Sequence, residues 1–271
     1  MIAIGFIGAG KMASAIINGL DKDTFSIQIS GRTLDTTQKT AHMLGIKAAA
    51  SHAELIQSSD IVVLAVKPHI IPAILSVHEI NKPLVSIAAG MTLSDLESLT
   101  TSKQPLIRVM PNINATIQKS TTGITRNANV SDDTFATVTA IFESIGSVHE
   151  LAEKDFGTFT ALAGSSPAYI YMFIDAMSRA GVLHGMSKDV STKIVAETVL
   201  ASAEMLLFSD LNPWTLVDNV SSPGGTTVAG IVSLEQNNFV ATVIDAIRAT
   251  SSNTTALYTA LAAFLPQVKG P

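Results

Sequence analysis

A glycine turn near the N-terminus constrains the fold of this chain more than any other feature. The turn Gly8-Ala9-Gly10 directly follows the apolar run from Ile2 to Ile7, and Ala13 takes the place of the third glycine in a GxGxxG pattern. Gly8 permits a tight turn, Gly10 lets the backbone approach a pyrophosphate, and Ala13 is small enough for close helix–strand packing. The turn therefore predicts a dinucleotide site. Its phosphates would face the free N–H groups and the positive dipole end of the next helix, near Lys11 and Met12.

Short apolar runs alternate with amphipathic stretches through the first half of the chain. We expect strands at 2–7, 26–30, 61–66, 84–88 and 106–110, with helices at 12–20 and 36–44. This alternation is typical of a doubly wound α/β fold, in which helices cover both faces of a parallel sheet. After about residue 150 the strand runs end, and residues 156–180, 187–208 and 239–264 have helical spacing. We therefore expect a Rossmann-type domain at 1–152 and an all-helical domain at 153–271.

The end of the second expected strand indicates which dinucleotide binds. Sites for NAD usually have Asp or Glu there to hold the ribose 2′-hydroxyl, whereas this chain has Ser30, Gly31, Arg32 and Thr33. Arg32 offers a planar cation to a 2′-phosphate, and Ser30 and Thr33 offer hydroxyl groups. The sequence therefore predicts NADP as the cofactor, with NAD used at lower efficiency.

Three further loops follow strand ends, where ligands of such sheets bind. Small residues in the second loop would let a nicotinamide ring lie close to the backbone, and Asn112 would contact ribose or substrate. Lys67 could approach the cofactor, although a structural lysine fits the pattern nearly as well. The residues that we assign to the cofactor from these loops are Val66, Lys67, Pro68, Ala88, Ala89, Gly90 and Asn112.

The most informative part of the second half is a loop rich in hydroxyl groups and glycine, from Asn219 to Thr227. Two glycines precede the start of another expected helix, so successive backbone N–H groups could form a nest for a carboxylate. A glycine turn before an ordinary helix start explains the same residues equally well.

Six motifs in one order make the chain similar to a known family. They lie at residues 5–13, 65–68, 88–90, 108–112, 164–169 and 221–227. In these motifs and their spacing the sequence resembles the pyrroline-5-carboxylate reductases. It departs from the usual pattern at Ile113-Asn114, where the family has Thr-Pro, and at Ser166, where the family has glycine. These departures concern local contacts, because the surrounding motif residues are retained.

The resemblance implies a Rossmann domain followed by a helical dimerisation domain, with five dimers assembled into a decamer. It also implies the last step of proline biosynthesis, the NADPH-dependent reduction of 1-pyrroline-5-carboxylate to L-proline. Asp210 is a weaker candidate for relaying a proton, and a surface charge at a helix end explains it better.

Residue roles in the second-domain loop also follow from the resemblance. The N–H groups of Gly225, Thr226 and Thr227 would hold the substrate carboxylate, and the Thr227 hydroxyl would approach the ring nitrogen as the catalytic group. Val220 and Ser222 would line this pocket. Asn219 would reach toward both cofactor and substrate.

Composition bounds the remaining classes of function. Charged residues are 14% of the chain, against about 25% in typical soluble domains, which favours a homo-oligomer over a monomer with a large core. The net charge is −5 without a basic patch, so we expect no nucleic-acid partner. No apolar run approaches the ~20 residues of a membrane span, and the N-terminal run reads as a strand because it lacks the basic region of a signal peptide. The absence of cysteine fits a reducing cytoplasm, and the six histidines show no metal-ligand spacing.

Three rival interpretations stay beside this one. A hydroxyacid dehydrogenase would need a lysine past the domain boundary, and the segment from Ala163 to Ser178 contains neither lysine nor histidine. A non-catalytic NADP-sensing binder would not need a loop for a substrate carboxylate. A reductase of another cyclic imine also fits, because pocket size cannot be read from sequence.

Overall fold

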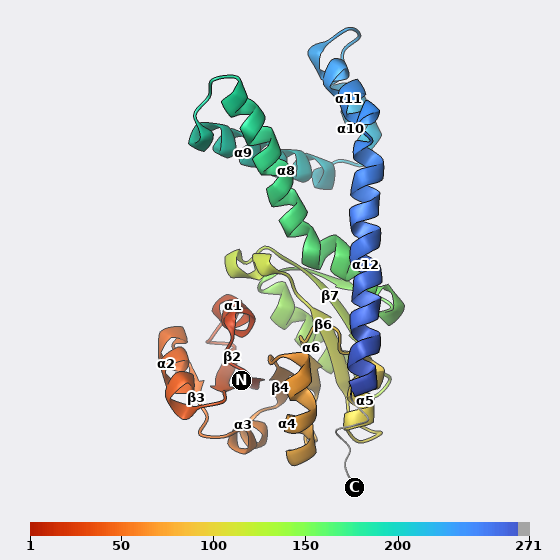
Figure 1. Cartoon of the computed structure of the whole chain (residues 1–271). Coiled ribbons are helices and arrows are strands. Elements are labelled where there is room, and N and C mark those ends of the chain that lie inside the picture. The colour runs from red at the N-terminus through yellow and green to blue at the C-terminus, as the bar shows by residue number, and fades with distance from the viewer. Residues whose placement is uncertain (265–271) are drawn as a thin grey trace. The chain divides into compact units, whose positions relative to one another are not determined.

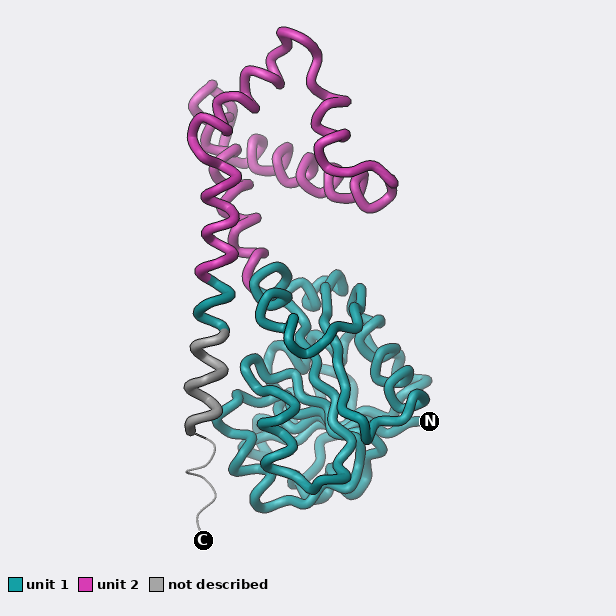
Figure 2. Tube along the Cα trace, turned by 90° about the vertical axis from the view of Figure 1, so that its right-hand side faces the viewer, with its two compact units in different colours: residues 1–164, 250–271 teal, residues 165–249 magenta. Residues whose placement is uncertain are grey.

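The computed structural model describes residues 1–264, which form two compact units. Unit 1 contains residues 1–164 together with the end of the chain from residue 250, and unit 2 contains residues 165–249 (Figure 2). The helical segment up to Gly164 is thus part of unit 1, whereas the sequence suggested a boundary at residue 152.

An eight-stranded sheet forms the centre of unit 1, in the order β3-β2-β1-β4-β5-β6-β7-β8 (Figure 1). All pairs from β3 to β6 are parallel, β7 is antiparallel to β6, and β8 is again parallel to β7. The doubly wound fold is therefore confirmed, with one reversal that the sequence did not indicate. The strands are β1 Ile2–Ile7, β2 Phe25–Ser30, β3 Lys47–Ala48, β4 Ile61–Leu64, β5 Leu84–Ser86, β6 Leu106–Met110, β7 Ser120–Arg126 and β8 Gly146–Glu150.

Helices cover both faces of this sheet. On one face Phe6 and Val63 lie in a buried cluster with side chains of α1, α2 and α6, and on the other Ile7 and Leu64 pack with α3, α4 and α5. Burying each large aliphatic side chain contributes about 1.5–3 kcal/mol, so both layers hold the strand ends in place. The helices are α1 Lys11–Gly19, α2 Leu34–Leu44, α3 His52–Ser58, α4 Ile71–Val77, α5 Leu93–Leu99 and α6 Asp132–Glu143.

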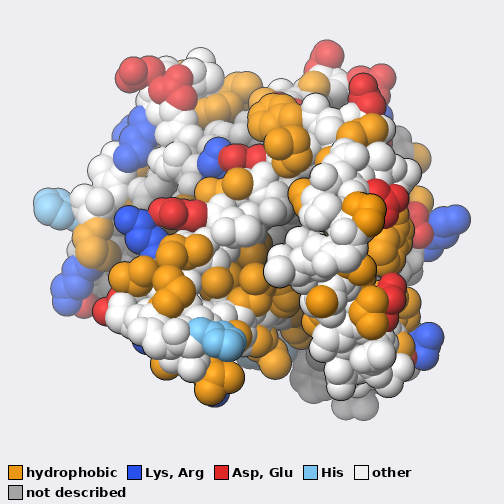
Figure 3. Space-filling model, turned by 90° about the horizontal axis from the view of Figure 1, so that it is seen from above, with side chains coloured by type: hydrophobic (Ala, Val, Ile, Leu, Met, Phe, Trp, Pro, Cys, Tyr) orange, Lys and Arg blue, Asp and Glu red, His pale blue; other side chains and the backbone are white. Residues whose placement is uncertain are grey.

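The chain leaves the sheet through α7 (Phe156–Phe159) and a π-helical turn at Thr160–Ser165. Unit 2 then consists of helices, as the sequence predicts for this half. They are α8 Ser166–Leu183, α9 Lys188–Phe208, α10 Pro213–Asn219 and α11 Thr226–Gln236. Unit 2 also contains the first part of α12 (Phe239–Phe264), up to residue 249. Many of their large apolar side chains are exposed, and Figure 3 shows many hydrophobic side chains, in orange, on the surface seen from above.

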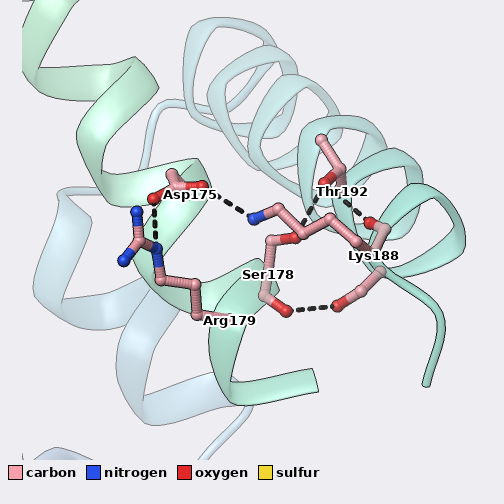
Figure 4. Close-up of polar contacts among 6 residues, drawn as sticks. Asp175, Ser178, Arg179, Lys188 and Thr192 are labelled. Carbon is pink, nitrogen blue, oxygen red and sulfur yellow. Dashed lines mark hydrogen bonds and ion pairs between the residues drawn. The ribbon is translucent and has the colours of Figure 1, made fainter. Parts of the chain in front are cut away.

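Polar contacts join α8 to α9 (Figure 4). Asp175 accepts hydrogen bonds from Nε of Arg179 at 2.6 Å and from Nζ of Lys188 at 2.7 Å. Nearby, the hydroxyl groups of Ser178 and Thr192 lie 2.7 Å apart. The α8–α9 hairpin is therefore fixed by side-chain bonds as well as by packing. No helix among the described residues is long and apolar enough to cross a membrane.

Candidate active site

The turn between β1 and α1 has the geometry that requires glycine. Gly8 has φ of +114°, and a Cβ there would lie 2.5 Å from the carbonyl oxygen of Ala65 and 3.0 Å from Cγ1 of Val66. A side chain would suffer both this contact and an unfavourable backbone conformation. The N–H of Gly8 donates to the carbonyl oxygen of Ser30 at 2.8 Å, so the turn is tied to the end of β2.

Gly10 and the start of α1 leave room for an anion. Apart from Gly10, its two chain neighbours and the adjoining helix backbone, no atom of the described residues lies within 4 Å of the place where a Cβ on Gly10 would stand. Gly10 is the N-cap of α1 and no side chain caps this helix, so its first N–H groups, at Lys11 and Met12, can bind a phosphate. Ala13 is buried beneath the turn, where a small residue allows close packing.

The residues at the end of β2 divide into a buried one and two exposed ones. Arg32 and Thr33 are exposed just before α2 begins, where they can reach a bound phosphate. Ser30 is only 1% exposed, and its hydroxyl oxygen lies 2.8 Å from Nδ1 of His52. The next acidic residue, Asp35, is paired with Lys39 at 2.8 Å.

The loops after β4 and β5 also lie at strand ends of this sheet. Lys67 is exposed, and its carbonyl oxygen accepts a hydrogen bond from the N–H of Ile70 at 2.9 Å. Val66 and Pro68 are half-buried beside it. After β5, Ala89 is exposed between two buried small residues, Ala88 and Gly90. The side chains are small here, as the sequence suggested for a nicotinamide site.

Asn112 is buried and makes its bonds within unit 1. Its Nδ2 donates to the carbonyl oxygen of Ala163 at 3.0 Å, and its Oδ1 accepts from the N–H of Asn114 at 3.2 Å. Ala163 belongs to the π-helical turn, a feature that occurs frequently at functional sites. The amide of Asn112 therefore anchors this turn, and its expected contact with ribose or substrate stays a prediction.

In unit 2, the glycine loop between α10 and α11 is a tight turn. Gly224 has φ of +68°, and a Cβ on Gly225 would meet the Ser222 hydroxyl oxygen at 2.5 Å. The N–H of Gly225 donates to the carbonyl oxygen of Ser222 at 3.0 Å. One of the three N–H groups that we expected to hold a carboxylate is therefore already engaged inside the turn.

The start of α11 supplies the other donors of this loop. Gly225 is the N-cap and no side chain caps the helix, so the N–H groups of Thr226 and Thr227 lack partners within it. Both threonines are exposed, as are Asn219, Val220 and Ser222. Asp210, the weaker candidate for a proton relay, is exposed between α9 and α10.

Two polar pairs in unit 1 were not found from the sequence. One is Ser30 with His52, and the other is Arg108, whose Nη1 lies 2.9 Å from Oε1 of Glu153 while its guanidinium lies over the ring of Phe156. Partners this far apart in sequence leave no local pattern. Among the described side chains, which end at residue 254, no cluster of three or more histidine or acidic groups could hold a metal ion.

Two family models match the chain. The model for pyrroline-5-carboxylate reductase dimerisation matches residues 153–257, and a model for coenzyme F420-dependent NADP oxidoreductases matches residues 3–90. Among curated proteins, the pyrroline-5-carboxylate reductase of Escherichia coli (strain K12) is 39% identical over 252 residues, covering 90% of this chain and 94% of that protein. The enzyme of the same name from Methanosarcina acetivorans is 36% identical over 252 residues, covering 90% and 93%.

Solved structures agree with these relatives. The 1-pyrroline-5-carboxylate reductase of Streptococcus pyogenes has a TM-score of 0.88 and 44% identity, covering 94% of this chain and 98% of that chain. The pyrroline carboxylate reductase of Plasmodium falciparum, solved with NADP bound, has a TM-score of 0.84 and 34% identity, covering 95% and 98%.

Proposed function

The chain belongs to the pyrroline-5-carboxylate reductase family, and we propose that it binds NADPH at the ends of β1 and β2 and its substrate at the start of α11. It catalyses the NADPH-dependent reduction of 1-pyrroline-5-carboxylate to L-proline. The observation that carries this conclusion is the 39% identity with the E. coli enzyme over 90% of the chain. The anion-binding turns of both units support the proposed sites.

The residues of unit 1 fit NADPH. The pyrophosphate would lie over Gly10, where the absence of a side chain leaves open space. It would accept hydrogen bonds from the N–H groups of Lys11 and Met12. Arg32 and Thr33, with Ser30, would hold the 2′-phosphate, and NADH would be used less efficiently because it lacks that group. The loops of Val66 to Pro68 and Ala88 to Gly90, with Asn112, complete the proposed cofactor site of unit 1. The contact of Asn219 with cofactor and substrate stays a prediction from the resemblance.

When bound, the cofactor supplies the hydride that adds to the imine carbon, while a proton adds to the ring nitrogen. The protein orients the reactants and stabilises charge. We assign the substrate carboxylate to the N–H groups of Thr226 and Thr227 and to the dipole of α11. Gly225 would keep this place free of a side chain, and Val220 and Ser222 would line it. The hydroxyl of Thr227 would bind the ring nitrogen and orient the C=N bond.

We propose that the helical domain at 153–271 forms a homodimer, with five dimers in a decamer. The family model that matches this half describes dimerisation. Extensive exposed apolar surface favours an interface. The side chains that are more than half exposed include Met172, Leu183, Leu200, Leu207, Phe208 and Trp214. A reducing compartment, the cytoplasm, is the proposed location.

An assay of NADPH oxidation with 1-pyrroline-5-carboxylate tests the function, with L-proline identified as the product. Rapid turnover with NADPH and slower turnover with NADH are expected. Binding of NADPH without turnover would support the sensing interpretation instead. Faster turnover of another cyclic imine would instead identify that imine as the substrate.

A further inference from the structure

Ser30 connects the two phosphate sites of the proposed NADPH pocket. Its carbonyl oxygen accepts the N–H of Gly8 in the pyrophosphate turn, and its hydroxyl oxygen lies 2.8 Å from Nδ1 of His52. Ser30 is only 1% exposed, and among the described residues its hydroxyl is paired with His52. The direction of its O–H bond therefore depends on which nitrogen of the His52 ring carries the proton.

His52 is held in place by its own surroundings. It is the first residue of α3, whose N-cap Ser51 accepts a hydrogen bond from the N–H of Glu54 at 3.1 Å. Its half-buried ring meets the ring of His78 edge-on, with centroids 5.9 Å apart. Burial first, and the neighbouring His78 second, lower the pKa of His52. The ring is therefore neutral near pH 7 and carries one proton, on either Nδ1 or Nε2.

The two tautomers give Ser30 opposite roles toward an anion. With the ring proton on Nε2, Nδ1 accepts a hydrogen bond from the Ser30 hydroxyl. The Ser30 oxygen can then only accept hydrogen bonds from its other neighbours. With the proton on Nδ1, the ring donates to the Ser30 oxygen, and the Ser30 proton is free. A phosphate only accepts hydrogen bonds, so it favours the second arrangement.

We propose that His52 is a positioning residue for NADPH, whose Nδ1–H donates to Ser30 and turns the Ser30 O–H toward the 2′-phosphate. The inference rests on the proposed function, in which Ser30 lines the 2′-phosphate site. His52 acts through Ser30 and contributes to the preference for NADPH over NADH. It has no role in the transfer step, which takes place at the other end of the cofactor.

Cofactor kinetics of His52 variants, together with NADPH affinity followed by fluorescence in the absence of substrate, test this role. His52→Leu removes the ring donor, and we expect about a tenfold lower kcat/KM for NADPH, mainly through KM, from one charge-assisted hydrogen bond. Turnover with NADH should stay within about twofold, because NADH has no 2′-phosphate. His52→Asn restores an N–H near Nδ1 and should recover most of the preference. His78→Ala is the matched control, since it removes the ring contact and keeps the Ser30–His52 bond.

A double-variant cycle separates the possible results. In a Ser30→Ala background, His52→Leu should have no further effect on the NADPH preference. An unchanged preference in His52→Leu alone would overturn the inference, and equal losses with NADPH and NADH would show a merely structural role and overturn it as well. If the parent shows no NADPH preference, or if Arg32→Ala does not reduce it, the cofactor assignment itself fails and the inference falls with it.

Discussion

Glu153, in the segment after β8, binds Arg108 of β6, with Oε1 of the carboxylate 2.9 Å from Nη1 of the guanidinium. The same oxygen accepts the N–H of Leu93 at 2.6 Å, at the start of α5. The Arg108 side chain is 5% exposed and that of Glu153 is 31% exposed. One carboxylate thus joins β6, α5 and the segment that leaves the sheet.

Removing this carboxylate should destabilise unit 1. Glu153→Ala removes a carboxylate partner from the buried Arg108 charge, and breaking a fully buried pair costs about 3–5 kcal/mol. Because Glu153 is partly solvated and Arg108 keeps its contact with Phe156, we expect about 2 kcal/mol by denaturant unfolding. The control is Asp132→Ala, which breaks the exposed Arg126–Asp132 pair and should cost under about 1 kcal/mol. Equal costs for both variants would contradict the buried role of Glu153.

The Asp175 cluster predicts a pH dependence of stability (Figure 4). Hydrogen bonds from Lys188 first, and from Arg179 second, lower the pKa of Asp175 from its ordinary value of 3.8. A carboxyl with a lowered folded-state pKa stabilises the fold above its unfolded pKa and loses this contribution as pH falls through the folded one. Asp175→Asn should therefore reduce the Tm at pH 7 and make it fall less steeply below pH 4. A Tm difference from the parent that is the same at every pH would refute this assignment.

Sequence patterns predicted the elements whose side chains repeat regularly. The strands at Ile2–Ile7 and Leu106–Met110 lie where the apolar runs placed them, and the long helices of the second half are also confirmed. By contrast, β7 and β8 at the end of the sheet contain mostly polar residues and glycine, so they gave no continuous apolar run. The antiparallel pairing of β7 with β6 was not predicted, because β7 itself was not recognised as a strand.

At the candidate site, motifs predicted the turns but not what their side chains bind. The glycine patterns located Gly8 and Gly225 at positions where a Cβ would collide, because turn geometry is local in sequence. The hydrogen bonds of Ser30 to His52 and of Asn112 to Ala163 join residues distant in sequence. Such pairs depend on how strands and helices pack, so the sequence alone could not indicate them.

The cofactor preference should reverse with the charge of Arg32. Arg32→Glu removes a cation and adds repulsion toward a 2′-phosphate, so kcat/KM for NADPH should fall by about ten- to a hundredfold, the equivalent of 1.5–3 kcal/mol. NADH should be little affected. Lys39→Glu makes the same change of charge on the exposed face of α2 and serves as the control. Equal use of NADPH and NADH by the parent would disprove the assignment.

Assembly should depend on the exposed apolar surface of unit 2. Light scattering of the parent at micromolar concentration should show at least a dimer. Leu207→Asp places a charge at a side chain that is 83% exposed in α9, and it should shift the protein toward smaller species because a charge is costly in an interface core. Met43→Asp makes the same change at a 76% exposed side chain of α2 and should leave the assembly intact. A stable parent monomer would rule out the proposed interface.

Thr227 offers the sharpest test of the substrate loop. Thr227→Ala keeps the backbone N–H at the start of α11 and removes only the hydroxyl. Loss of one hydrogen bond to a charged partner costs about 1.5–3 kcal/mol, which corresponds to roughly a ten- to hundredfold decrease in kcat/KM for 1-pyrroline-5-carboxylate. NADPH affinity, followed separately by fluorescence, should barely change, because the Thr227 hydroxyl is assigned to the substrate.

Two neighbouring substitutions decide what the Thr227 result means. Thr226→Ala removes a hydroxyl to which we assign no role and should keep nearly full activity, since its N–H remains. Gly225→Val should be more damaging than Thr227→Ala, because a Cβ at Gly225 meets the Ser222 hydroxyl oxygen at 2.5 Å and displaces the turn that orients the donors. A substrate analogue without the carboxylate should react poorly with the parent and respond little to changes in this loop. Full activity of Thr227→Ala, or a joint loss of NADPH binding and turnover, would show that the loop does not hold the substrate as we propose.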